Sequence, residues 1–334
     1  MSKYLTLKIT IMLIKKFITG IITVCILLSS CNTRQDQKKE PELHPQTVQH
    51  TAKEVVLDSL DIPAIESALD GLKGTENNGE YKVTIPQNDL EIIVDGFQII
   101  PPMGLGSWAA FAPAKEGAML MGDIVVTETD LWPVQQEVIR QGLTITAIHN
   151  HFVRNRPNVM YMHIGGMGDG AILAAKAKAV LDKVQEVRGD NPVDGPKIEV
   201  KNTLDTEKIA EILGHSGKMN RGVYKITIGR PDVDLREHGA PVSTFMGFNT
   251  WASWQGTQEK AAVAGDFTML ANEVAPVIKA LVENGIEVVA VHNHMVHEEP
   301  QIYFLHYWGV GPAEKLAKSL KQALDQTGNT KQKE

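Results

Sequence analysis

Six of the chain's 11 histidines fall in two short stretches that share one spacing. Each stretch has two histidines two positions apart and a third twelve positions later, so the candidates are His149, His151 and His163, and then His292, His294 and His306. Residues two apart on a strand point to the same face. If two antiparallel strands turn near Pro157 or Pro300, the third histidine faces the second across the strand pair. The spacing therefore predicts three converging imidazoles in each stretch, which is the geometry of a metal site.

Zinc is the metal we expect, because neutral imidazole suits it and the only two cysteines, Cys25 and Cys31, precede the body of the chain. Iron and copper are the alternatives. Three protein ligands leave one position open for water, and the metal lowers the pKa of that water towards about 7. The expected chemistry is attack on an ester or similar carbonyl. The competing interpretation, a set of ordinary core histidines, loses weight because the pattern occurs twice.

Four carboxylates are candidate acid or base groups. Asp123 and Asp266 each follow a glycine at matching places in the two halves of the chain. They could orient a ligand histidine through its second ring nitrogen, although Gly-Asp pairs are typical of turns, so a turn role is favoured. Glu298 and Glu299 lie in the loop beside the second histidine stretch. They are candidates for a catalytic base or a substrate contact, with plain solvated surface as the alternative.

Two tryptophans recur in the same way. Trp108 and Trp251 occupy matching positions, with Phe111 and Trp254 three residues further on. Packing in the core is the favoured interpretation, and an aromatic wall of a ligand pocket is the alternative.

The body of the chain repeats itself with a shift of 143 residues. Tyr81–Ile85 corresponds to Tyr224–Ile228, Trp108 corresponds to Trp251, and one histidine stretch corresponds to the other. The register holds without a gap over residues 81–180. A single long duplication of this kind differs from a solenoid, whose repeats are much shorter.

Each half shows the same order of helical and extended patterns, which predicts an α+β fold of two tandem homologous units. The last two strands of each unit are joined by a short loop, so we expect a mixed or antiparallel sheet with helices packed on it. The expected helices cover 63–73, 129–141 and 171–187 in one unit, and 205–213, 270–284 and 313–325 in the other. The predicted boundaries are 58–187 for the first unit, 188–203 for a linker, 204–327 for the second unit and 328–334 for a disordered tail.

Residues 1–30 have the pattern of a signal peptide, because a pair of lysines precedes an apolar run over 17–28 that is short for a membrane span. The sequence Leu28-Ser29-Ser30-Cys31 resembles the bacterial lipobox, which implies cleavage before Cys31 and acylation of Cys31. The polar residues that follow predict a disordered tether over 31–57. We therefore expect a protein of the cell envelope that is anchored to membrane lipid and faces the periplasm or the surface, with the outer membrane favoured because Asn32 is not acidic.

The net charge of the chain indicates which kinds of partner it can bind. The formal net charge is −7, and removal of residues 1–30 would take away four lysines and no acid. Binding to nucleic acid relies on clustered lysine and arginine, so a nucleic-acid partner is not expected. A small-molecule substrate is expected instead.

Residues 265–311 resemble a bacterial family known as the LppY/LpqO lipoprotein type, a domain of unknown function. Residues 122–168 are a weaker copy of the same pattern, and the resemblance extends over residues 58–326. It implies a tandem-duplicated domain without a known activity. The first copy departs from the pattern at 154–156 and 165–166, so the second unit is expected to be the more active one.

The spacing of the histidines is also similar to that of a eukaryotic zinc-dependent ester hydrolase family. The similarity is confined to the three histidines of each stretch. It implies zinc ligation by those six residues and, by analogy, ester hydrolysis.

These patterns together predict a lipid-anchored metalloprotein with an open three-histidine zinc site in each unit and with hydrolysis of an ester as its candidate activity. A non-catalytic envelope lipoprotein that binds a metal or another ligand is the alternative. It is favoured by the lack of a carboxylate with an obvious base position in both units. A redox or oxygenase site is a third interpretation.

Overall fold

The computed structural model describes residues 59–115, 117–189 and 198–328, which all belong to one compact unit, Glu54–Glu334. The predicted signal peptide, Cys31 and the tether over 31–57 lie outside the described residues. So do residues 190–197 of the predicted linker and 329–334 of the predicted tail. Within the described ranges, no helix is both long and apolar enough to span a membrane.

The first repeat is an antiparallel sheet with helices on one face. The strand order is β1-β2-β5-β6-β8-β7. Its elements are α2 (Ile62–Ala68), β1 (Thr75–Asn77), β2 (Glu80–Pro86), β3 (Ile92–Val94), β4 (Phe97–Ile99), the 3-10 helix η1 (Pro101–Met103), β5 (Gly106–Ala114), β6 (Gly117–Thr127), α3 (Leu131–Arg140), β7 (Thr144–His149), β8 (Val159–Gly168) and α4 (Gly170–Arg188).

The second repeat has the same plan, with strand order β9-β10-β13-β14-β17-β15. Its elements are α5 (Thr206–Leu213), β9 (Gly217–Asn220), β10 (Val223–Gly229), β11 (Arg236–Glu237), β12 (Ala240–Pro241), β13 (Asn249–Gly256), β14 (Ala261–Leu270), α6 (Ala271–Glu283), β15 (Glu287–His292), β16 (Glu298–Glu299), β17 (Ile302–Gly311) and α7 (Ala313–Leu324). The predicted α+β class with two tandem units is therefore confirmed.

Local sequence signals explain where the helices begin and end. Asp169 accepts a hydrogen bond from the backbone N–H of Ile172 at the start of α4, and Asp205 caps α5 in the same way. Gly142 and Gly285 adopt positive φ angles of 67° and 77° just after α3 and α6, a conformation that glycine adopts without steric cost.

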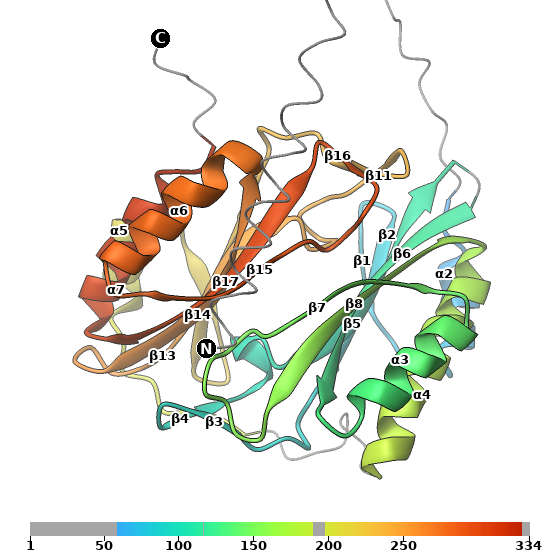
Figure 1. Cartoon of the computed structure of the whole chain (residues 1–334), viewed down its shortest axis with the longest axis horizontal. Helices are drawn as coiled ribbons and strands as arrows, with labels where there is room; N and C mark the ends of the chain where they lie inside the picture. The colour runs from blue at the N-terminus through green and yellow to red at the C-terminus, as the bar shows by residue number, and fades with distance from the viewer. Residues whose placement is uncertain (1–58, 116, 190–197, 329–334) are drawn as a thin grey trace, which may run out of the picture. The chain divides into compact units, whose positions relative to one another are not determined.

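Each sheet is buried on both faces. One face carries the helices of its own repeat over a separate apolar core. The other face contributes to two clusters that mix residues of both repeats. Figure 1 shows α3 and α4 outside one sheet and α6 and α7 outside the other, with β7 and β15 between them. The two repeats therefore form one structure rather than two independent domains.

The sheet edges β7 and β15 meet at the junction of the repeats. The Thr146 hydroxyl donates to the carbonyl of His294 at 2.7 Å, and the Asn293 amide donates to the carbonyl of Thr146 at 3.1 Å. Nearby, the Arg154 guanidinium bridges Asp95 and Glu287 with N···O distances of 2.6–2.9 Å. These contacts fix the position of one histidine stretch relative to the other.

The pairing of the histidine strands differs from the predicted one. His163 faces Ala147 rather than His151, and His149 faces Tyr161. In the second repeat His306 faces Ala290, and His292 faces Phe304. The two strands of the first repeat are antiparallel and are joined by the loop over 150–158, which contains Pro157.

The reason lies in the loop that follows β7. Arg156 exchanges both backbone hydrogen bonds with Ile93, at 3.0 and 3.1 Å, and so draws the loop towards β3. β7 therefore ends at His149, and His151 lies beyond the sheet.

Two glycines, Gly104 and Gly247, each lie close to a tryptophan of the other repeat. A Cβ atom at Gly104 (φ 102°) would lie 2.9 Å from Cη2 of Trp251, whereas a Cβ atom at Gly247 (φ 107°) would lie 3.6 Å from Trp108. Both alanine variants pay for the left-handed backbone, about 1–2 kcal/mol. Only Gly104→Ala also has to displace a tryptophan.

We therefore expect Gly104→Ala to lower the free energy of unfolding, measured in urea, by more than Gly247→Ala does. Gly96→Ala (φ 83°, nothing within 4 Å of the new Cβ) is the control for backbone strain alone. Equal losses in all three variants would show that the contact with Trp251 contributes nothing.

Candidate metal centre

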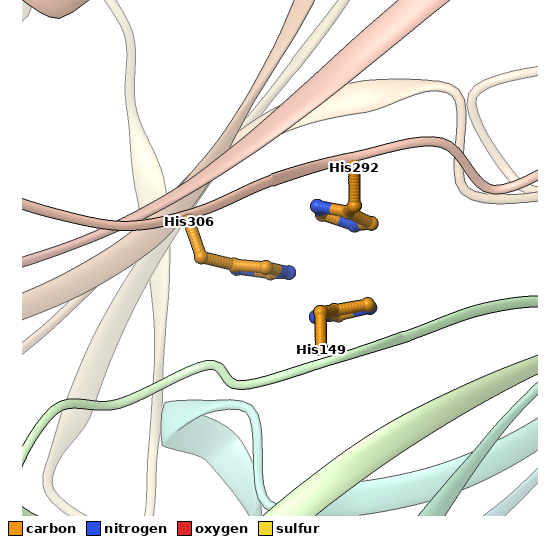
Figure 2. A group of neighbouring side chains, drawn as sticks. All are labelled: His149, His292 and His306. Carbon is orange, nitrogen blue, oxygen red and sulfur yellow. The ribbon is translucent and has the colours of Figure 1, made fainter. Parts of the chain in front are cut away.

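The six predicted histidines gather into one cluster at the junction of the repeats. His149 and His292 end the edge strands β7 and β15, and their rings stack with centroids 3.7 Å apart. His163 and His306 project from the middle of β8 and β17, and His151 and His294 follow the edge strands. Figure 2 shows the rings of His149, His292 and His306 pointing towards one another from the two repeats.

The histidines that come within ligand distance of one another are not the predicted in-repeat sets. Two groups have ring nitrogens that all lie within 4.8 Å of one another, and each group mixes the repeats. They are His149, His292 and His306, and His163, His292 and His294. The physical reason is the meeting of β7 with β15, which brings the histidine pair of one repeat next to the third histidine of the other.

The ring distances reveal an approximate two-fold relation within the cluster. His163 and His294 have centroids 4.1 Å apart, and their counterparts His306 and His151 have centroids 3.9 Å apart. The group of His163, His292 and His294 therefore has a counterpart in His306, His149 and His151. We call these two sets the crossed triads, because each combines the histidine pair of one repeat with the third histidine of the other.

Backbone carbonyls orient several of the rings. His306 Nδ1 lies 3.0 Å from the carbonyl oxygen of Gly265, and His151 Nδ1 lies 3.2 Å from that of Gly104. This contact with the carbonyl fixes the ring and directs Nε2 into the cluster, which is how second-shell carbonyls support metal-bound histidines. Tyr161 and Phe304 lie flat against His151 and His294, with centroids 3.3 and 3.4 Å away.

The remaining ring nitrogens suit a cation. Nε2 of His149, His163 and His306, Nδ1 of His294 and both ring nitrogens of His292 are buried without a hydrogen-bond partner among the described residues. A buried polar atom without a partner costs about 1–3 kcal/mol, and a bound metal ion would remove that cost. His292 exposes part of its side chain, but its nitrogens are buried like the others.

Burial also sets the charge of the cluster. It lowers the pKa of His149 to about 4 and the pKa values of the other five histidines well below the usual 6.5. Repulsion between neighbouring imidazolium charges acts in the same direction. The rings are therefore neutral at physiological pH, which is the form that binds metals.

Asp123 and Asp266 do not cap turns. They lie in the middle of β6 and β14, where they face His163 and His306 on the neighbouring strands. Asp266 Oδ2 lies 3.6 Å from His294 Nε2 and 3.9 Å from His306 Nε2, while Asp123 Oδ2 lies 3.8 Å from His151 Nε2. The favoured turn interpretation was wrong because the glycines before them continue the strand.

Burial raises the pKa of Asp123 to about 8 and that of Asp266 well above its usual range. Each carboxyl group can therefore hold a proton near neutral pH beside the histidines. In each of them Oδ1 has no hydrogen-bond partner within the described ranges.

Glu298 and Glu299 are not brought into the cluster. They form β16, which pairs with Glu237 and Arg236 of β11 in a separate small sheet. Neither lines the pocket that the histidines reach. The candidate acid or base groups near the histidines are therefore Asp123 and Asp266.

Sequence reasoning missed two lysines. Lys82 and Lys225, on β2 and β10, line a pocket of about 240 Å³ together with both aspartates and His151, His163, His294 and His306. Burial lowers the pKa of each lysine to about 8. They were visible as matching residues of the repeat, but their side chains point to the site only because the sheets of the two repeats face each other.

Trp108 and Trp251 both line this pocket and are only half-buried. The Lys82 ammonium lies 3.9 Å from the ring centroid of Trp108, and the Lys225 ammonium lies 4.2 Å from that of Trp251. The core interpretation holds for Phe111 and Trp254, which are fully buried. Trp108 packs against an apolar core cluster and also lines the pocket, and Trp251 lines the pocket.

The fold and site define a tandem-repeat α+β protein with a histidine cluster shared between its repeats. The chain belongs to the family described as Domain of Unknown Function (DUF1259), whose pattern matches residues 64–183 and again 207–326. The tandem duplication is thereby confirmed. The resemblances to the LppY/LpqO type and to the ester hydrolase family stay predictions.

Other comparisons add no functional information. No curated protein matches the chain. The trimeric bacterial microcompartment shell protein PduB aligns over 75% of this chain and 88% of its own, at 9% identity and a TM-score of 0.18. EtuB from Clostridium kluyveri aligns over 76% and 90%, at 8% identity and a TM-score of 0.17. Scores this low support no structural argument.

The buried histidines make the metal-free protein sensitive to acid. Their pKa values are lower in the folded state than in the unfolded chain, so unfolding takes up protons below pH 6.5. The stability they contribute above pH 6.5 is lost as the pH falls towards 4, by about 1.4 kcal/mol per pH unit for each proton taken up. The two buried aspartates act oppositely, because burial raises their pKa values in the folded state so that they bind protons on folding, but they are fewer.

We therefore expect the free energy of unfolding, measured in urea with a chelator present, to fall steeply from pH 6.5 to pH 5. The double variant His163→Gln, His294→Gln should flatten this slope. The matched variant His215→Gln changes an exposed histidine outside the cluster and should leave the slope as it is. A wild-type slope near zero over this range would contradict the burial of neutral imidazoles.

Proposed function

We propose that this protein is a metal-dependent hydrolase of the cell envelope whose metal sites are the two crossed triads. The observation that carries the proposal is the set of buried ring nitrogens without partners among the described residues, which belong to all the clustered histidines except His151. One crossed triad has its ring nitrogens within 4.8 Å of one another, and the other has ring centroids 3.9–5.2 Å apart. Four of the six histidines also line a pocket that contains carboxyl and ammonium groups. Substrate could therefore reach the metal ligands from one side.

Zinc is the metal we propose, since the cluster offers neutral imidazoles and no thiolate. A zinc ion held there would polarise a carbonyl and lower the pKa of a water molecule towards about 7. Asp123 and Asp266 lie beside the Nε2 atoms of the histidines and hold protons near neutral pH. In this protonated form they are suited to donate a proton to the leaving group as general acids.

A non-catalytic metal-binding protein is the second candidate. It is favoured by His292, which belongs to both groups of converging nitrogens. A single ion held by His149, His292 and His306, which come from both crossed triads, could take a further imidazole and leave no coordination position open for a substrate.

The site can be tested by counting metal in double variants. If the triads are crossed, His163→Ala with His294→Ala damages one site, so about half of the wild-type zinc per chain should remain. His294→Ala with His306→Ala damages both sites and should remove nearly all of it. Sites confined to single repeats predict the reverse order. The measurement is elemental analysis of the purified, zinc-saturated protein.

The same proteins, assayed with p-nitrophenyl acetate, test the activity. Turnover should follow the zinc content, and the exposed control His215→Ala should match the wild type. Full zinc occupancy without turnover on any ester would leave the non-catalytic candidate. Wild-type protein without bound metal would refute both.

The cell-envelope location is proposed from the lipobox-like sequence before Cys31. We expect the full chain, produced in bacteria with labelled palmitate, to carry label and to sediment with membranes. Cys31→Ala should lose both properties, whereas Cys25→Ala, which changes the other cysteine, should keep them. Label on the Cys31→Ala protein would contradict the anchor.

A further inference from the structure

The pocket above the histidines has two chemically distinct ends. The carboxyl groups of Asp123 and Asp266 lie next to the histidines. The ammonium groups of Lys82 and Lys225 lie over the tryptophan rings. The acids therefore lie beside the histidines, while each ammonium group lies over the indole ring of its own repeat.

Neither ammonium group forms an ion pair within 4.0 Å in the part of the chain that the structure describes, and Lys82 donates to the carbonyl of Phe245 at 3.3 Å. Burial is the largest effect on both lysines and lowers their pKa values, and repulsion by Lys225 lowers that of Lys82 further. Attraction by Asp123 and Glu80 on Lys82, and by Asp266 on Lys225, offsets only part of this effect. An anion placed between the two lysines would relieve both the burial cost and the repulsion.

A groove of about 760 Å³ leads into this pocket and shares Thr84, Pro101 and Lys225 with it. Its lining includes Lys218, Arg221 and Lys225 and no carboxylate. This lining is notable in a chain with a formal net charge of −7. A low-dielectric groove of one sign attracts ligands of the opposite sign.

The basic residues of the groove, Lys218, Arg221 and Lys225, all come from the second repeat. The counterparts of Lys218 and Arg221 in the first repeat are Thr75 and Asn78, which carry no charge. The approximate two-fold relation of the histidines is therefore broken at the approach to the site. A negatively charged ligand would therefore be attracted to the site along the second repeat.

We propose that the pocket binds an anionic substrate, whose carboxylate or phosphate group is held between Lys82 and Lys225 and whose remaining part lies along the groove past Lys218 and Arg221. This proposal rests on the proposed function for the reaction, but the binding of the anion itself does not require a metal.

The first experiment measures binding of inorganic phosphate and of acetate to the full chain by titration calorimetry at low salt, with and without a chelator. We expect at least one of the two anions to bind the chelated wild type, and the double variant Lys82→Met, Lys225→Met to weaken that binding about tenfold or more. Lys82→Arg with Lys225→Arg keeps the charge and should retain most of the affinity. Lys315→Met changes an exposed lysine elsewhere and should bind like the wild type.

The two anions separate phosphate from carboxylate as the group recognised. Wild-type protein that binds neither would overturn the proposal. Unchanged anion binding in the double methionine variant would also overturn it. The same holds for anion binding that requires zinc and does not depend on the two lysines. Zinc content measured on the same samples keeps the two proposals apart, because anion binding by a metal-free chain would leave this proposal standing while the hydrolase fails.

The second experiment compares two esters, the neutral p-nitrophenyl acetate and the anionic p-nitrophenyl succinate. We expect kcat/KM to favour the anionic ester about tenfold or more in the wild type. Lys82→Met with Lys225→Met should abolish this preference, and Lys218→Ala with Arg221→Ala should reduce it mainly through KM. An unchanged preference in both variants would count against the proposed path of the substrate.

Discussion

The contact between the sheet edges β7 and β15 is the constraint on which the site depends. An edge strand carries unpaired backbone groups and is a liability unless something covers it. Here each edge is covered by the other repeat, through the hydrogen bonds of Thr146 and Asn293. Because both edge strands end in a histidine pair, covering the edges also buries the imidazoles against each other.

That burial is costly without a ligand. Several ring nitrogens lack partners, and the loss of about 1–3 kcal/mol for each is comparable in sum with the entire stability of a typical domain. The surrounding structure compensates through the mixed apolar clusters and through Arg154, which ties Asp95 to Glu287 across the repeats. A cation bound by the crossed triads would convert the unfavourable term into a favourable one, and folding and metal binding would then be thermodynamically coupled.

The sequence was sufficient to predict the duplication, the α+β class and the histidines that gather, because these depend on local periodicity and on matching positions in the two repeats. It was insufficient for the partners of each histidine. His151 was expected to face His163, but the loop after β7 pairs with Ile93 instead, and that contact between distant residues has no local signal. The same limit explains Lys82 and Trp108, whose side chains reach the site only when the second repeat closes over them.

Crossed triads have a consequence for how such a protein works and evolves. A site confined to one repeat could survive loss of the other, whereas each crossed triad needs a histidine from both. Duplication therefore created a site that neither unit contains alone, and it also freed the two approaches to diverge. Lys218 and Arg221 on one side, against Thr75 and Asn78 on the other, show that this divergence has occurred. Under the proposed function, symmetry at the histidines combined with asymmetry at the entrance would place the specificity of the site in its approach rather than in its centre.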